Sequence, residues 1–170
     1  MNLTPVPFSF IKNVSLSWRD ALWGYERQLI GWSGIVDFAV DRVSAGSDNP
    51  LEIELSGLGK SETQQVGELL RALANRELDK KCETAEKKWL FLVLAWLFER
   101  RADVSDPLSE VETIYADFDY PSEIESFVGY MPATDGYDSS KQSIEENNAR
   151  LFAKWEKYLS EMRQNLGITQ

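Results

Sequence analysis

The stretch EKKWLFLVLAWLFERR, residues 86–101, decides the fold of this chain. Its apolar run, residues 89–98, lies between charged ends and contains no polar residue. A helix that is apolar on every side packs among other helices, whereas crossing a bilayer takes about 20 such residues. The segment 85–101 is therefore predicted to be the central helix of a bundle. The core is expected around Trp89, Leu92, Val93 and Trp96.

Helix-start signals precede apolar stripes on both sides of this segment. Capping boxes pair an N-cap Ser with an Asp, Glu or Gln three residues later, and they begin at Ser17, Ser61 and Ser143. Asp106 before Pro107 supplies a capping side chain and a proline at the first helical position. These signals predict an all-α, single-domain bundle of about six to eight helices over residues 1–170.

One short segment carries a strand signal. LEIEL, residues 51–55, alternates between apolar and acidic residues, which is the period of a β-strand. The preceding Asn49 and Pro50 are a helix-start pair, and the chain offers no evident partner strands. A helical turn is the favoured interpretation, and a strand stays open as the alternative.

Cysteine content and the N-terminus bear on the compartment. Cys82 is the only cysteine, so no internal disulfide can form, and MNLTPVPFSF lacks the basic start and long apolar run of a signal peptide. We expect a cytoplasmic protein.

The net charge of −10 is concentrated in one part of the chain. Residues 103–146 contain twelve carboxylates and a single basic residue, Lys141. Nucleic acids and anionic membrane surfaces both require basic patches on their protein partners. We therefore expect neither as a partner.

Catalytic motifs are largely missing from the sequence. The chain has no histidine, which excludes His-based triads and His metal ligands, and GLGKSE at 57–62 lacks the first glycine of a phosphate-binding loop. Four carboxylates could chelate a hard cation if the chain turned back at Pro121: Asp117, Asp119, Glu123 and Glu125. We expect no enzyme activity, no cofactor and no metal, with a carboxylate-metal enzyme as the weaker alternative.

Acidic and aromatic residues instead alternate through residues 115–138. Tyr115 and Phe118 have helical spacing and are expected in the core, whereas the tyrosines near the prolines and in the turn-rich segment 131–142 are expected on the surface. Exposed rings surrounded by carboxylates suit a basic protein partner. The candidate partner-binding residues are Asp117, Asp119, Tyr120, Glu123, Glu125, Tyr130, Asp135, Tyr137 and Asp138.

Four segments carry a family resemblance: LSWRDALWGY (16–25), NPLEIELSGL (49–58), KWLFLVLAWLFERR (88–101) and DPLSEVETIYADFDYPSEIESFVGYMP (106–132). They resemble a bacterial family of unknown-function domains associated with immunity proteins of polymorphic and contact-dependent toxin systems. The resemblance covers residues 8–136, and the C-terminal helix lies outside it.

That resemblance implies a role without assigning any residue to it. The chain is expected to bind and neutralise a cognate toxin, in many such systems a basic nuclease, for which an acidic surface is a suitable inhibitor. An adaptor for another basic protein is the alternative. The oligomeric state, the identity of the toxin and the mode of inhibition stay open.

Overall fold

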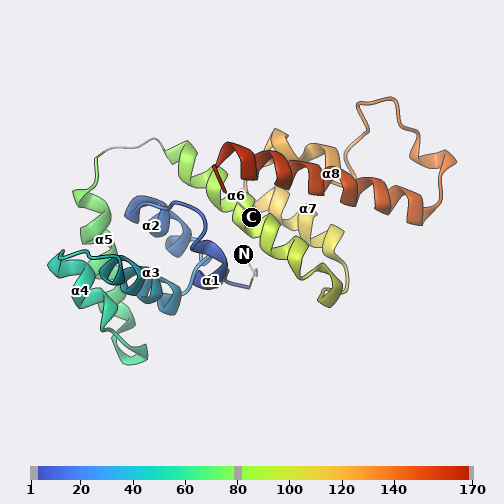
Figure 1. Ribbon diagram of the computed structural model, residues 1–170. Helices are drawn as coiled ribbons and strands as arrows, with labels where there is room; N and C mark the ends of the chain where they lie inside the picture. Colours follow the sequence, from blue (N-terminus) through green and yellow to red (C-terminus); the bar gives the residue numbers. More distant parts are fainter. Residues whose placement is uncertain (1–3, 79–81, 169–170) are drawn as a thin grey trace. The chain divides into compact units, whose positions relative to one another are not determined.

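The computed structural model describes residues 4–78 and 82–168, with the side chains of 82–84 excepted, so the thiol of Cys82 lies outside the described residues. These residues form helices and no strand (Figure 1). The all-α prediction is confirmed. The α-helices are α1 (Phe8–Ile11), α2 (Trp18–Glu26), α3 (Trp32–Ser44), α4 (Pro50–Ser56), α5 (Thr63–Arg76), α6 (Cys82–Glu99), α7 (Pro107–Asp117) and α8 (Ile144–Asn165). The 3₁₀ helices are η1 (Lys60–Glu62), η2 (Arg101–Asp103), η3 (Ser122–Phe127) and η4 (Ser139–Lys141).

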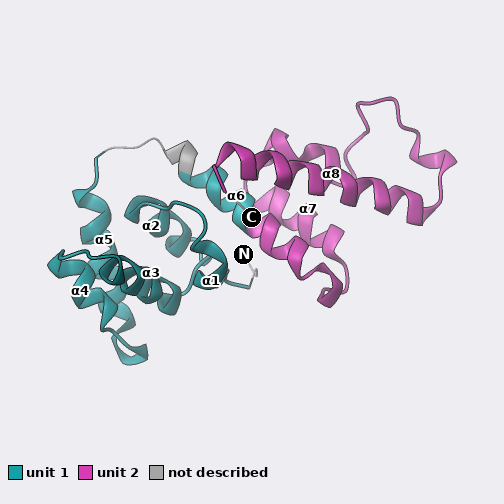
Figure 2. Cartoon of the chain, in the orientation of Figure 1, with its two compact units in different colours: residues 1–92 teal, residues 93–170 magenta. Residues whose placement is uncertain are grey.

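The chain divides into two compact units, residues 1–92 and 93–170 (Figure 2). The boundary falls inside α6, which the sequence predicts as the central helix. The single domain expected over residues 1–170 stays a prediction. The first unit carries thirteen carboxylates against eleven Lys and Arg, and the second carries fifteen against seven. The excess negative charge is therefore concentrated in the second unit.

In the first unit, the core is built around a close approach of two helices. Trp89 of α6 is fully buried, and its indole nitrogen donates to the carbonyl of Asp20 in α2 at 2.7 Å. A Cβ atom on Gly24 would lie only 2.2 Å from the Trp89 ring. Glycine weakens a helix interior, but Gly24 lies inside α2 because it is the contact point for Trp89.

The N-terminus of α2 is capped twice. Ser17 and Asp20 form the predicted capping box, with backbone-to-side-chain distances of 3.0 and 3.1 Å. The carboxylate of Glu77, at the end of α5, also accepts hydrogen bonds from the backbone nitrogens of Trp18 and Arg19, at 2.8 and 2.9 Å. A helix N-terminus leaves its first N–H groups without helical partners, and Glu77 satisfies two of them.

The predicted segment 51–55 lies in α4, so the helical interpretation is confirmed. The burial of two of its side chains is the opposite of what their polarity suggests, because the acidic Glu52 is buried while the apolar Ile53 is 49% exposed. Glu52 accepts hydrogen bonds from the indole nitrogen of Trp18 at 2.7 Å and from the hydroxyl of Ser47. These donors compensate for burying the carboxylate.

Two sequence predictions in these regions are wrong. Ser61 does not cap a helix, because it lies within η1, and Glu62 instead accepts from the backbone nitrogen of Gly59 at 2.7 Å. Trp96 is only half-buried, unlike Trp89, Leu92 and Val93, although the adjacent Leu97 is buried.

The second unit packs around Trp155 of α8, which is fully buried. Its ring lies 5.0 Å from that of Phe98 and 6.2 Å from that of Phe127, between ring centroids. The predicted Ser143–Glu146 capping box begins α8. The helix is therefore anchored at its first turn by local hydrogen bonds and at its middle by aromatic packing.

Candidate functional site

The acidic face of α7 follows from the burial of its apolar stripe. Asp106 caps the helix by accepting from the backbone nitrogen of Ser109 at 3.0 Å, as predicted. Val111, Ile114 and Tyr115 are buried. Because these residues occupy the inner side of the helix, other positions face solvent, and Asp117 is exposed at its last residue.

The end of α7 has an unusual backbone. Asp119 and Tyr120 both have a φ of 59°, in the left-handed region that favours glycine. The nitrogen of Asp119 bonds to the carbonyl of Ala116 at 3.1 Å, and that of Tyr120 bonds to the carbonyl of Tyr115 at 2.8 Å. This is the Schellman pattern, here with an aspartate where glycine is usual. It brings the ring of Tyr120 back against the ring of Tyr115.

Three tyrosines and one glutamate meet at this helix end, and we call Tyr115, Tyr120, Tyr130 and Glu125 the tyrosine cluster. Tyr115 is 4% exposed, whereas Tyr120 and Tyr130 are each 58% exposed. The centroid of the Tyr115 ring lies 5.2 Å from that of Tyr120 and 6.2 Å from that of Tyr130. The cluster thus presents two solvent-facing rings on a buried one.

Glu125 of η3 completes the cluster. The hydroxyl of Tyr115 donates to Oε1 of Glu125 at 3.2 Å. Burial raises the pKa of Tyr115 above its ordinary value, and the hydrogen bond to Glu125 raises it further. The tyrosine is therefore a neutral donor at physiological pH, and Glu125 is half-buried beside it.

Three of the predicted carboxylates lie close to this cluster in the sequence and are exposed to solvent. Asp117, Asp119 and Glu123 face solvent, and within residues 4–78 and 82–168 no Lys or Arg forms an ion pair with them. Exposed carboxylates without a cationic neighbour are available to an incoming basic surface.

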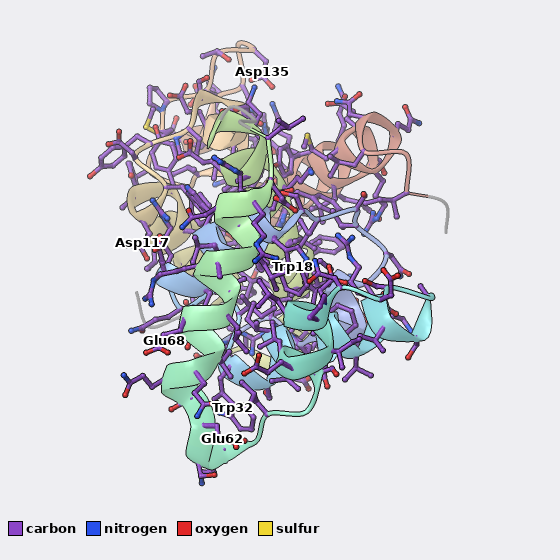
Figure 3. The ribbon with its side chains drawn as sticks, turned by 90° about the vertical axis from the view of Figure 1, so that its left-hand side faces the viewer. Trp18, Trp32, Glu62, Glu68, Asp117 and Asp135 are labelled. Carbon is purple, nitrogen blue, oxygen red and sulfur yellow. The ribbon has the colours of Figure 1, made fainter. Side chains whose placement is uncertain are left out.

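The other three predicted residues have intramolecular roles. Asp135 forms ion pairs with Arg150 and Lys154 of α8, each at 2.8 Å. Tyr137 is half-buried, because the guanidinium of Arg150 covers its ring. Asp138 caps η4 through the backbone nitrogen of Ser140. Figure 3 shows Asp135 well apart from Asp117. The expectation that Tyr137 lies freely on the surface is therefore corrected, and Asp135 is paired within the chain.

The ion pairs hold the loop that precedes α8. Residues 131–143 are mostly irregular, as predicted for 131–142, with only η4 inside them (Figure 1). Hydrogen bonds from Lys154 and then Arg150 lower the pKa of Asp135 below its ordinary value of 3.8. The hydroxyl of Tyr137 adds a 2.7 Å hydrogen bond to Asn147. These contacts tie the loop to the first turns of α8.

A groove of about 1060 Å³ runs between the start of α7, the segment after η3 and α8. Its acidic lining comes from Asp106 and Glu112 at α7 and from Glu125 of η3. Its basic lining comes from Arg150 and Lys154 of α8. Tyr130 also borders it. The groove is mixed in charge, unlike the exposed acidic residues at the end of α7.

Sequence reasoning missed the residues that pair with the loop. Arg150 and Lys154 are four positions apart and so share a face of α8, which is the one signal that could have indicated a joint role. Their choice of Asp135 depends on the path of the loop, for which the sequence holds no signal.

The described part of the chain contains no group of three or more His, Cys, Asp or Glu side chains placed to hold a metal ion. Nor does any described helix combine the length and apolar content that crossing a bilayer requires.

Residues 8–163 match a protein family described as an uncharacterized protein conserved in bacteria (DUF2247). The chain belongs to this family. The match covers more of the chain than the resemblance over residues 8–136 and includes most of α8. No curated protein and no solved structure matches the chain.

Proposed function

We propose that this protein binds a basic protein partner through the end of α7, and that the partner is a bacterial toxin which the binding neutralises. The observation that carries the binding proposal is the combination of two exposed tyrosine rings with three exposed carboxylates. The rings, each 58% exposed, are Tyr120 and Tyr130, and the carboxylates are Asp117, Asp119 and Glu123. We call these five residues the α7-end surface.

The two kinds of side chain have different tasks in association. Exposed carboxylates attract a basic surface over about 10 Å at ordinary ionic strength and so act mainly on the association rate. Tyrosine rings that become buried against a partner hold the complex together and act mainly on dissociation. The excess of carboxylates over Lys and Arg in residues 93–170 adds to the attraction.

The toxin as partner rests on the resemblance to immunity proteins and on membership of a family conserved in bacteria. A protein that intercepts a toxin inside the producing cell acts in the cytoplasm, which is part of the proposal. Inhibition is stoichiometric and requires no catalysis by this chain.

The test begins with a toxic protein encoded next to the gene for this chain. Co-expression should restore growth, and the purified proteins should form a complex. The triple variant Asp117→Lys, Asp119→Lys and Glu123→Lys should associate at least about tenfold more slowly and depend less on salt. Tyr120→Ala should instead speed dissociation, by about 2 kcal/mol in binding free energy if the ring is a hot spot.

A charge-matched control lies in the first unit. Asp37, Asp41 and Glu54 are exposed on α3 and α4, so their replacement by Lys changes the net charge by the same amount. The variant with these three control substitutions should keep most of the association rate and should still protect cells against the toxin. Equal loss in both triple variants would show that only net charge matters, and normal binding by the α7-end variant would refute the proposed surface. Binding without protection would identify an adaptor.

A further inference from the structure

The second unit already contains an arginine held by a tyrosine and a carboxylate. The guanidinium carbon of Arg150 lies 4.1 Å from the centre of the Tyr137 ring, while its Nη2 donates to both oxygens of Asp135 at 2.8 Å. The ring attracts the cation through its face, and the carboxylate neutralises it. Both components come from this chain, and so does the arginine.

The tyrosine cluster offers the same two components without a cation. Tyr120 and Tyr130 present exposed rings, and Glu125 presents a carboxylate next to the buried Tyr115. Oε1 of Glu125 accepts from Tyr115, whereas Oε2 has no hydrogen-bond partner among residues 4–78 and 82–168. No Lys or Arg of the same residues pairs with Glu125. The cluster is therefore complementary to a cation that the described chain does not supply.

We propose that the tyrosine cluster binds an arginine side chain of the protein partner, with its guanidinium on the ring of Tyr120 or Tyr130 and its N–H groups on Glu125. This inference rests on the proposed function, since it specifies which group of the basic partner is recognised. In this proposal Glu125 accepts hydrogen bonds from the partner's arginine, as Asp135 accepts them from Arg150.

Arginine suits the cluster better than lysine for a geometric reason. A planar guanidinium can stack on a ring while its edge donates to a carboxylate, whereas an ammonium group is a compact point charge. Arginine is also the cation in each ring contact recorded among the described residues, with Arg27 3.8 Å from the Trp23 ring and Arg101 3.9 Å from the Phe98 ring.

The experiment uses three short peptides with the intact protein: acetyl-Gly-Arg-Gly-amide, its citrulline counterpart and its lysine counterpart. Citrulline keeps the shape of arginine and removes the charge. Aromatic and carboxyl resonances are followed by NMR during each titration. The arginine peptide should shift the signals of Tyr120, Tyr130 and Glu125 and bind about tenfold more tightly than the citrulline peptide.

Variants then separate the cluster from its surroundings. Glu125→Gln keeps an acceptor for the Tyr115 hydroxyl and should weaken arginine binding about tenfold. Tyr120→Leu and Tyr130→Leu change exposed rings and should each weaken it several-fold. Asp37→Asn, on the exposed side of α3 and outside both the cluster and the α7-end surface, should bind the peptide as the parent does. Circular dichroism confirms that each variant is folded.

The outcomes also distinguish this inference from the proposed function. Equal binding of the arginine and citrulline peptides, shifts that avoid the cluster, tighter binding of lysine, or an unchanged Glu125→Gln titration would each overturn it. If the partner still requires Asp117, Asp119 and Glu123 while Glu125→Gln and the leucine variants bind it normally, the proposed function stands and the arginine site is refuted. If no basic partner binds and the arginine peptide does, the proposed function fails separately.

Discussion

At the scale of single residues, Asp119 and Tyr120 give the α7-end surface its geometry. Their left-handed backbone turns the chain sharply after α7 and packs the ring of Tyr120 edge-to-face against that of Tyr115. Aspartate tolerates this conformation better than most residues because its short side chain can interact locally, but it still carries a cost that glycine avoids. Gly46 and Gly167 have positive φ angles after α3 and α8, where glycine adopts such a conformation without steric cost.

Substitution at Asp119 tests this backbone directly. We expect Asp119→Gly to raise the free energy of unfolding by about 1 kcal/mol, because glycine relieves the left-handed strain, and Asp119→Val to lower it by about 1–2 kcal/mol. The side chain is exposed, so little packing changes in either variant. Chemical denaturation measures both. Equal stabilities for the two variants would show that the backbone at this position is not left-handed in solution.

At the scale of elements, side chains from distant parts of the chain complete what local caps begin. Glu77 caps α2 from a position 59 residues beyond Trp18, and Asp135 ties the loop 131–143 to α8. In both cases one carboxylate accepts hydrogen bonds from two groups, which holds the start of α2 in the first case and the loop before α8 in the second.

Removal of the Glu77 carboxylate should leave two N–H groups of α2 without their partner. Glu77→Ala is expected to lower the free energy of unfolding by about 2–3 kcal/mol, since charged hydrogen bonds are lost from a partly buried helix end. Glu68 is the control, because it is exposed and, among residues 4–78 and 82–168, its side chain accepts only from Gln64. Its replacement by Ala should change stability by less than about 0.5 kcal/mol. A matching small loss for Glu77→Ala would refute its capping role.

The attachment of the loop should depend on pH. Because the pKa of Asp135 is lower in the folded protein than its ordinary value of 3.8, its contribution is fully present above about that pH and is lost as the pH falls through the lowered pKa. Carboxyl NMR should therefore give Asp135 a midpoint below 3.8, and hydrogen exchange in the loop should accelerate at lower pH. Asp135→Asn should show fast exchange at every pH. A midpoint at or above 3.8 would mean that the ion pairs do not persist in solution.

At the scale of the whole molecule, each compact unit has its own buried tryptophan. Trp89 anchors residues 1–92 through Asp20 and Gly24, and Trp155 anchors residues 93–170 through Phe98 and Phe127. Both are fully buried, so their surroundings tolerate little added volume.

Gly24→Ala tests the packing of the first unit. The added Cβ would lie 2.2 Å from Trp89, which no side-chain adjustment at position 24 can relieve, so we expect a loss of about 3 kcal/mol in unfolding free energy. Gly57→Ala is the control, since its Cβ would meet only ordinary van der Waals contact at 3.7 Å. Thermal and chemical unfolding measure both. A Gly24→Ala protein as stable as the control would place Trp89 elsewhere.

The sequence by itself determined the helical class and the starts of α2, α4, α7 and α8. The caps at Ser17, Asn49, Asp106 and Ser143 are local, because each side chain bonds to a backbone nitrogen two or three residues away. The buried run in α6 is likewise encoded by consecutive apolar residues. Such signals depend on near neighbours in the chain and can be recognised without the fold.

The tertiary structure alone decided which polar groups are satisfied within the chain and which face solvent. Glu52 is buried because Trp18 and Ser47 reach it, and Asp135 is paired because its loop passes Arg150 and Lys154. Glu125, by contrast, meets the hydroxyl of Tyr115, and no Lys or Arg in the part of the chain that the structure describes pairs with it. All of these carboxylates look alike in the sequence, because a carboxylate's partner is set by the path of the folded chain and not by its neighbours.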